Sequence, residues 1–310
     1  MKNVIITGSV AYDYIFNFDN YFSNYIVPDK VHSINISLLT EQYKKSFGGT
    51  AGNQGFYLNK LGVNAYIYST VGEDFGEYKY FLKKNNIESK FIQIKKGHHT
   101  AAGFAITDKK DNQIWMYSRG ALKYSDKLRL NSLSVGSDPL VIIAPNEAKA
   151  VENFVNECVR SKMEFVLDLG FNIPLTKKDI LQKGIKNAAI IFGNDYEIDL
   201  MEKKAGIPFK KDLKHNQILV TTFADLGSTI FQNKKEIKVG IYKTKAIDPT
   251  GAGDAYRAGF IYGYLNNQPL KICGWMGAVT SSFAVEVKGT MNLKFNKRVF
   301  EKRMKTIWNI

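Results

Sequence analysis

A chain of 310 residues is long enough to bury a large hydrophobic core. Its composition, 45% hydrophobic and 13% aromatic, excludes the disordered class. The formal net charge of +14 would suit a nucleic-acid surface, but the basic residues are spread in short pairs and no nucleic-acid-binding motif accompanies them. We therefore expect a basic surface that suits small anionic molecules, with no nucleic acid as a partner.

The ends and the cysteines point to the cytoplasm. The N-terminal stretch "MKNVIITGSV" has an apolar run of only about four residues, which is too short for a signal peptide. No stretch approaches the roughly 20 apolar residues of a membrane span. Cys158 and Cys273 are far apart and form no C-x-x-C pair. We expect a cytoplasmic protein with no membrane partner.

Short runs rich in Val and Ile recur along the chain. They predict strands at 4–7, 66–71, 140–144, 165–169, 188–192 and 218–222. Between the later runs, apolar residues at spacings of three and four predict helices at 147–161, 176–187 and 194–206. Alternating strands and helices form a parallel sheet that is covered on both faces. The sequence therefore predicts an α/β fold in a single domain of residues 1–310, with a mostly parallel central sheet flanked by helices.

Two regions break this alternation. Residues 14–47 and 91–118 contain short extended segments of period two, and "DKKDNQ" supplies a turn between two of them. Such segments could be edge hairpins of the main sheet. We favour a small β-sheet lid, because ligands of open α/β sheets bind at the strand ends and a cover excludes water there.

The stretch "DPTGAGDAYRAGF", residues 248–260, has the composition of a phosphate-binding helix start. The small residues Gly251, Ala252 and Gly253 precede Asp254 and a run of helix formers. The first N–H groups of a helix lack internal acceptors and carry partial positive charge, so phosphate oxygens can approach them where side chains are small. Asp254 would be favoured in any first turn, but beside a phosphoryl group it could also act as a general base.

The common glycine loops do not fit this stretch. The chain contains no G-x-x-x-x-G-K-[ST] string, and Tyr256 occupies the third position that G-x-G-x-x-G would require. A second glycine cluster, "FGGTAGNQGFYLNKLG" at 47–62, places Gly48 and Gly49 in a turn before a helix that carries Asn53. A Gly-Gly turn before a helix is common, but two separated glycine-rich helix starts, one with an aspartate and one with an asparagine, are less common in one chain.

Together, "DPTGAGDAYRAGF", "GGTAGNQGFYLNKLG" and "STVGEDFG" resemble the sequence patterns of the PfkB, or ribokinase-like, carbohydrate kinase family. The resemblance extends from "GSVAYD" near the start to "VEVKGT" at 285–290. It implies a ribokinase-like fold. Two positions depart from the family pattern: Gly55, where Ser, Thr or Ala is usual, and Ala224 in "TFADLG", which replaces the first glycine of T-x-G-x-x-G.

The resemblance also implies roles for individual residues. Asp254 matches the base that takes a proton from the acceptor hydroxyl, and Gly251, Ala252 and Gly253 match the anion hole for the γ-phosphate of ATP. The implied substrate contacts are Asp13, Gly48, Gly49, Asn53, Phe104 and Gln113. The implied ATP contacts are Asn194, Thr222, Gly227, Thr250 and Gly253.

Cofactors follow from the same resemblance. Asn194 and Glu197, in "NDYE", resemble an N-x-x-E motif that orients Mg²⁺ and phosphates through water, as a hard cation with few protein ligands requires. Taken alone, N-x-x-E also fits a helix cap. The segment from Ala284 to Thr290 resembles the part of the family beside the ATP base and a monovalent-cation site. The expected cofactors are ATP and Mg²⁺, with a monovalent cation such as K⁺ as an option.

The acceptor is indicated by two stretches, 26–37 and 100–121, which resemble prokaryotic nucleoside kinases of the adenosine kinase type. A flat base needs an apolar sandwich, and the lid segments 14–47 and 91–118 offer aromatic side chains that could equally pack a small sheet. They are Phe16, Phe18, Tyr21, Phe22, Phe104, Trp115 and Tyr117. We expect an ATP-dependent kinase that phosphorylates the 5′-hydroxyl of adenosine to give ADP and AMP, as in purine salvage. We expect it to be a monomer or homodimer.

Two alternatives remain at this level. A sugar or sugar-phosphate kinase of the ribokinase, fructokinase or phosphofructokinase type would belong to the same family, and Arg119 and Lys30 could supply the cations that a sugar phosphate needs. A nucleotide-binding protein without activity is the other alternative. Asp254 argues against it, because binding alone has no use for that acid.

Overall fold

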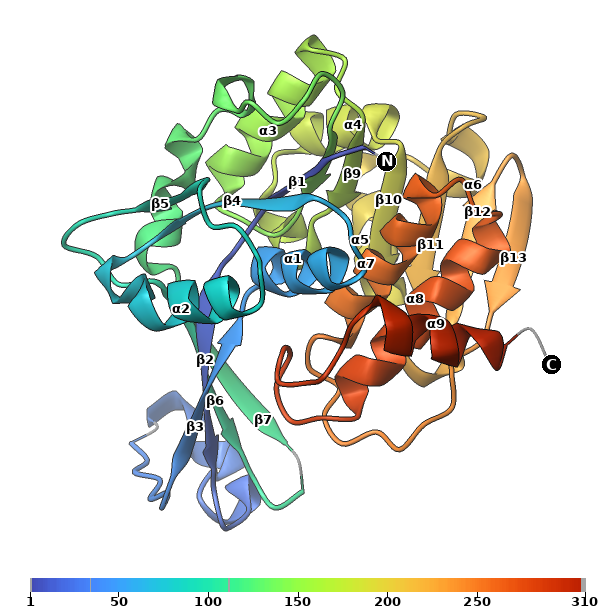
Figure 1. Ribbon diagram of the computed structural model, residues 1–310. Coiled ribbons are helices and arrows are strands. Elements are labelled where there is room, and N and C mark those ends of the chain that lie inside the picture. The colour runs from blue at the N-terminus through green and yellow to red at the C-terminus, as the bar shows by residue number, and fades with distance from the viewer. Residues whose placement is uncertain (1, 34, 111, 308–310) are drawn as a thin grey trace.

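The computed structural model describes residues 2–33, 35–110 and 112–307, and it contains two β-sheets of unequal size (Figure 1). The large sheet has the strand order β13-β12-β11-β10-β9-β8-β1-β4-β5. Its strands are β1 (Val4–Thr7), β4 (Ala65–Val71), β5 (Ile92–Ile94), β8 (Leu140–Ile143), β9 (Phe165–Asp168), β10 (Ile190–Asn194), β11 (Ile218–Thr222), β12 (Ser228–Gln232) and β13 (Lys235–Val239). The pairs β11–β12 and β12–β13 are antiparallel and the other pairs are parallel, which confirms the predicted mostly parallel sheet.

Helices cover both faces of this sheet (Figure 1). They are α1 (Thr50–Lys60), α2 (Gly76–Lys84), α3 (Ala148–Arg160), α4 (Lys178–Asn187), α5 (Asp195–Ala205), α6 (Phe209–Asp212), α7 (Ala252–Leu265), α8 (Leu270–Val285) and α9 (Lys297–Lys305). Successive side chains of a strand point to opposite faces. Val4 and Ile6 of β1 therefore share one core with α1, α2, α7, α8 and α9, while Ile5 shares a second core with α3, α4, α5 and α6.

The small sheet has the order β3-β2-β6-β7 and consists of β2 (Ala11–Asn17), β3 (Tyr43–Gly48), β6 (Ala101–Thr107) and β7 (Gln113–Ser118). Most of its residues fall within the predicted segments 14–47 and 91–118. The prediction was wrong for 92–94: β5 pairs in parallel with β4 in the large sheet, and Ile92 is buried there in the core. Burial of Ile92 accounts for this, because the edge of the large sheet offers it an apolar environment.

The carboxyl ends of several central strands carry polar residues and lie together along one side of the large sheet. Asp168, Asn194 and Thr222 end β9, β10 and β11, which lie side by side. Strand β1 ends at Thr7 and continues through residues 8–10 into β2, so the small sheet begins at this same side (Figure 1). Ligands of open α/β sheets bind at the side where the carboxyl ends of the strands lie.

The departure at Gly55 has a packing cause. Gly55 lies in α1, and a Cβ added there would be 2.7 Å from Ile67 Cγ1 on β4. Glycine therefore lets α1 approach the large sheet closely.

No helix in the described part of the chain combines the length and the apolar character needed to cross a membrane.

Candidate active site

The start of α7 presents free backbone donors. Its N-cap, Gly251, has φ 79°, a left-handed conformation that favours glycine. The N–H of Ala252 donates to the carbonyl of Pro249 at 3.1 Å. The N–H groups of Gly251, Gly253 and Asp254 have no acceptor among the described residues. Three free donors at the positive end of a helix can bind an anion, and Ala252 contributes space there rather than a donor.

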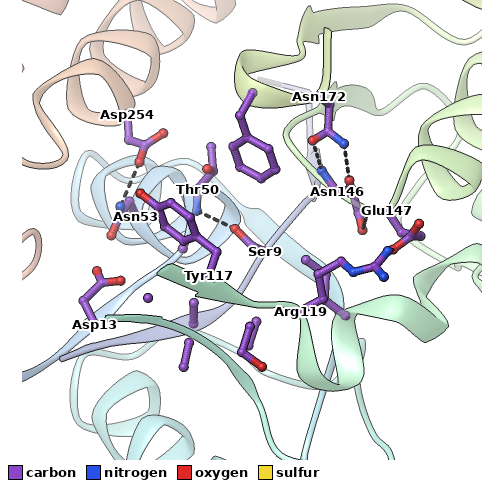
Figure 2. A pocket seen from close by; sticks show the side chains of 18 of the residues that line it. Ser9, Asp13, Thr50, Asn53, Tyr117, Arg119, Asn146, Glu147, Asn172 and Asp254 are labelled. Carbon is purple, nitrogen blue, oxygen red and sulfur yellow. Dashed lines mark hydrogen bonds and ion pairs between the residues drawn. The ribbon is translucent and has the colours of Figure 1, made fainter. Parts of the chain in front are cut away.

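Asp254 belongs to a buried polar network (Figure 2). Its Oδ2 accepts a hydrogen bond from Asn53 Nδ2 at 2.7 Å, and its Oδ1 accepts a longer one from Gln54 Nε2 at 3.4 Å. Gln54 Nε2 also donates to Asp168 Oδ2 at 3.0 Å, and Arg257 Nε lies 2.7 Å from that oxygen. Burial raises the pKa of Asp254 to about 6, although Arg257 and the Asn53 hydrogen bond act in the opposite direction. A carboxyl group with this pKa can accept a proton near neutral pH.

A cavity of about 300 Å³ lies on one side of the α7 start, where the small sheet meets the large one (Figure 2). Among the predicted site residues, its walls contain Asp13, Gly49, Asn53, Thr250, Gly251 and Asp254. Residues from β2, α1 and α7 therefore meet in one place although they are far apart in the sequence. Thr250, expected to contact ATP, lies in the wall of this first cavity.

Asp13 is held between two glycines. A Cβ on Gly48 would overlap its carboxylate, and a Cβ on Gly103 would lie 2.9 Å from Oδ1. Burial raises the pKa of Asp13 to about 7, and the negative charges of Asp254 and Asp248 add to the shift. Gly48 thus acts on the predicted substrate contact by leaving it room.

Phe104 and Gln113 lie elsewhere. Phe104 stacks on Tyr14, the neighbour of Asp13 on β2, with ring centroids 5.1 Å apart. Because strand side chains alternate between faces, Phe104 lies on the face of the small sheet opposite to Asp13. Gln113, at the far end of β7, donates to Thr107 Oγ1 at 3.0 Å. The structure therefore does not bring Phe104 or Gln113 to the first cavity.

Two other aromatic rings do line this cavity. Tyr117 from β7 and Phe171 from the short helix Gly170–Leu175 have ring centroids 6.3 Å apart and planes within 12° of parallel. Both are largely exposed, at 71% and 64%. Tyr117 was among the aromatic residues expected to contact a base, and Phe171 was missed. Its signal was its position in "DLGFN", directly after the strand that ends at Asp168.

A second cavity of about 360 Å³ lies on the other side of the α7 start. Its walls include the predicted Thr222, Gly227 and Gly253 together with apolar residues such as Val285. Gly227 has φ 95°, and a Cβ there would overlap the carbonyl oxygen of Val239. Only glycine fits this turn. The free donors of α7 therefore lie between two cavities.

The loop of this second cavity contains Ala224 with φ 48°, a left-handed conformation that costs an L-residue about 1–2 kcal/mol. The chain thus keeps the turn that the family pattern builds with glycine. Replacing Ala224 by glycine is expected to raise the free energy of unfolding by about 0.5–1 kcal/mol, as measured by urea denaturation. The same replacement at Ala205, the buried last residue of helix α5, is expected to lower it, and a loss of stability at both positions would contradict this account.

Asn194 and Glu197 form a capping box at the start of α5. Glu197 N donates to Asn194 Oδ1 at 2.8 Å, and Asn194 N donates to Glu197 Oε2 at 2.9 Å. No group of three or more His, Cys, Asp or Glu side chains in the described residues is arranged to hold a metal ion. The capping box uses Asn194 Oδ1 and Glu197 Oε2, so a contact of these residues with Mg²⁺ stays a prediction.

Asp248 ties the loop before α7 to the segment expected near a monovalent cation. Its Oδ1 accepts from Thr250 N and its Oδ2 from Gly289 N, both at 2.9 Å. The carboxylate thereby fixes the loop that leads to the free donors of α7.

Comparisons with known proteins agree with this arrangement. The sequence matches the model of the pfkB family carbohydrate kinases over residues 1–297. A nucleoside kinase from Methanocaldococcus jannaschii is 31% identical over 295 residues, which cover 93% of this chain and 92% of that protein. A solved structure of the Burkholderia thailandensis nucleoside kinase in complex with inosine has a TM-score of 0.89 and 25% identity, and covers 99% of both chains. Its complex with ADP-inosine has a TM-score of 0.86 and 27% identity, and covers 99% of this chain and 96% of that one.

Two cavities that meet at a helix start with free N–H donors are the arrangement expected of a group-transfer enzyme. The chain belongs to the pfkB family of carbohydrate kinases. It is therefore a phosphotransferase whose acceptor is an alcohol group.

Proposed function

We propose that the protein transfers the γ-phosphoryl group of ATP to the 5′-hydroxyl of a nucleoside. The observation that carries this proposal is the position of Asp254 and the free N–H groups of α7 between two cavities. The first cavity would hold the acceptor and the second the nucleotide. The names of the Methanocaldococcus and Burkholderia proteins support the nucleoside as acceptor class.

The first cavity suits a nucleoside. Tyr117 and Phe171 present two nearly parallel, largely exposed rings on which a flat base can stack. Asp13 offers carboxylate oxygens to the ribose hydroxyls. Adenosine, the expected substrate, and inosine, which the Burkholderia protein binds, share the flat purine that this cavity would accept.

The transfer would use groups at the start of α7. Asp254 accepts the proton of the attacking hydroxyl while the bond from that oxygen to phosphorus forms and the bond to the ADP oxygen breaks. The N–H groups of Gly251 and Gly253 stabilise negative charge on the phosphoryl oxygens. Mg²⁺ near Asn194 and Glu197 would neutralise phosphate charge. We propose that the small sheet acts as a lid that excludes water and holds the acceptor in place.

The acceptor class is tested by measuring ADP release with ATP and Mg²⁺. The panel is adenosine, inosine, guanosine, cytidine, ribose, fructose and fructose 6-phosphate. Turnover with purine nucleosides is expected, and turnover confined to the sugars would contradict the proposal. Arg119 lines the first cavity and is paired with Glu147 at 2.8 Å, so turnover of fructose 6-phosphate alone would favour the sugar-phosphate alternative. The side chain of Lys30, the other expected cation, lies outside those that the structure describes.

The base-binding role predicts a clear kinetic effect. Replacing Tyr117 or Phe171 by alanine is expected to raise the nucleoside KM about 10-fold or more, because stacking a base on an aromatic ring contributes about 1–3 kcal/mol. The KM for ATP should stay within about two-fold. Tyr80 on α2 is also 69% exposed and provides a matched aromatic control. Equal increases in the KM values for nucleoside and ATP would show that these rings do not bind the base of the acceptor.

A further inference from the structure

Arg257 brings a full positive charge to the start of α7. It lies four residues after Gly253 on the helix, and helical side chains lean toward the N-terminus. A Cβ added to Gly253 would be only 2.7 Å from Arg257 Nη1. The guanidinium therefore lies over Gly253, which lines the second cavity and carries one of the free N–H groups.

Most of the hydrogen-bonding capacity of Arg257 is unused. Its Nε lies 2.7 Å from Asp168 Oδ2, and its Nη2 is 3.7 Å from Glu197 Oε2, which is too long for a hydrogen bond. Among the residues that the structure describes, neither Nη1 nor Nη2 makes a hydrogen bond, although these two atoms carry four of the five guanidinium donors. The side chain is only 11% exposed. Nε is buried without a hydrogen bond to the described residues, whereas Nη1 and Nη2 are not among the buried atoms that lack a partner. The two terminal nitrogens therefore reach open space, where a ligand can supply the acceptors that they lack.

A second unpartnered group lies on the acceptor side of Asp254. Asn53 Oδ1 is buried without a hydrogen bond, and Asn53, 4% exposed, lines the first cavity. Its Nδ2 is fixed by Asp254, so the free oxygen can accept from a hydroxyl. The unused acceptor, Asn53 Oδ1, is complementary to a hydroxyl group. The unused donors of Arg257 are complementary to a phosphoryl group, and the two groups would meet at Asp254.

We propose that Arg257 binds the phosphoryl group that is transferred and completes the anion site formed by the N–H groups of Gly251, Gly253 and Asp254. This inference rests on the proposed phosphoryl transfer. A planar guanidinium can hold two phosphoryl oxygens at once. It takes no proton in the reaction: the hydroxyl proton goes to Asp254, and ADP leaves with the electrons of the broken bond.

Neighbouring carboxylates hold the guanidinium in position. Asp168 pairs with Nε, which leaves both terminal nitrogens available, and Glu197 lies near Nη2 from the start of α5. Negative charge spreads over the equatorial oxygens of the phosphoryl group in the transition state. A fixed positive charge beside these oxygens stabilises that state without reorganisation.

The test compares Arg257→Gln and Arg257→Lys with the wild type. Calorimetric titrations with ATP and with ADP, both with Mg²⁺, measure how much affinity the γ-phosphate contributes. Kinetics with the best acceptor of the panel give kcat and both KM values. In Arg257→Gln we expect the ATP-to-ADP affinity ratio to fall toward 1, kcat to fall about 10²–10³-fold and the nucleoside KM to change less than about two-fold. Arg257→Lys should be intermediate, since lysine keeps the charge but not the fork.

Arg129 provides a matched control. It lies 3.8 Å from the buried Glu157, away from both cavities, and Arg129→Gln removes an arginine beside a carboxylate there. An unchanged ATP-to-ADP ratio in Arg257→Gln, or equal losses for ATP, ADP and nucleoside with a lower Tm, would show that Arg257 is only structural. If Arg257→Gln does not fold, the ATP-to-ADP affinity ratio of Arg257→Lys is used instead, and a ratio equal to that of the wild type would contradict the proposal. The ATP and ADP titrations need no acceptor. If no acceptor of the panel is phosphorylated, the proposed function is contradicted, but the titrations still measure whether Arg257 binds the γ-phosphate.

Discussion

Replacing Asp254 by asparagine is expected to lower kcat by about 10²–10⁴-fold, the usual loss when a general base is removed. Asparagine has the same shape and can accept the hydrogen bond from Asn53 through its one oxygen, but it gives up the longer contact with Gln54 and cannot take the hydroxyl proton. ATP affinity should stay within a few-fold, since the donors of α7 are backbone groups. Initial rates of ADP release at saturating substrate and calorimetric titration of ATP measure the two quantities.

The same carboxylate predicts a pH dependence. A base must be ionised, so the wild-type kcat is expected to fall as the pH is lowered through about 6, the raised pKa of Asp254. The residual activity of Asp254→Asn should lack this acid limb. Near-full turnover of the variant, or an unchanged acid limb, would remove Asp254 from the role of base.

Replacing Asp13 by asparagine is expected to impair nucleoside binding and yet stabilise the protein. The nucleoside KM should rise about 10-fold or more, because hydrogen bonds to a charged group contribute about 1.5–3 kcal/mol. The pKa of Asp13 is about 7 in the folded state and 3.8 in the ordinary environment of an unfolded chain. The folded state therefore binds more protons between these values, and stability falls as the pH rises through this window.

The stability gain should accordingly depend on pH. Above about pH 7 the wild type carries the full cost of an ionised, half-buried carboxylate, and Asp13→Asn should gain about 1–2 kcal/mol. Near pH 4 both proteins carry a neutral side chain, and the gain should vanish. Urea denaturation at about pH 5 and about pH 8 measures the trend. Asp19, whose side chain is 91% exposed, provides a carboxylate control, and an Asp13→Asn variant with equal KM changes for ATP and nucleoside would place Asp13 outside the acceptor site.

The large sheet could be predicted from sequence because its strands are buried on both faces. Runs such as "VIIT" and "LVII" leave little choice for the backbone, and the structure places β1 and β8 there. Strands β12 and β13 were missed. They lie beyond the parallel part of the sheet, and β13 is largely polar and exposed, so no apolar run marks it.

Two features of the site could not be predicted from sequence: the face of the small sheet that each side chain takes, and the buried polar residues that the tertiary structure brings together. Phe104 and Tyr117 lie on paired strands of the small sheet, and a shift of one residue decides which face each side chain takes. No pattern in the sequence fixes that register. The network of Gln54, Asp168 and Arg257 was also missed, because α1, β9 and α7 supply one residue each and only the tertiary structure makes these polar groups neighbours.

The chain passes directly from β1 of the large sheet into β2 of the small sheet, and each sheet carries different residues of the candidate site. Asp13 and Tyr117 lie on the small sheet, whereas Asp254 and the free donors belong to α7, which packs on the large sheet. Under the proposed function, the small sheet carries part of the acceptor site and none of the phosphate-handling groups, while Phe171 adds a base contact from the segment after β9. A laboratory search for new acceptors can therefore mutate the small sheet and Phe171 and leave the start of α7 intact.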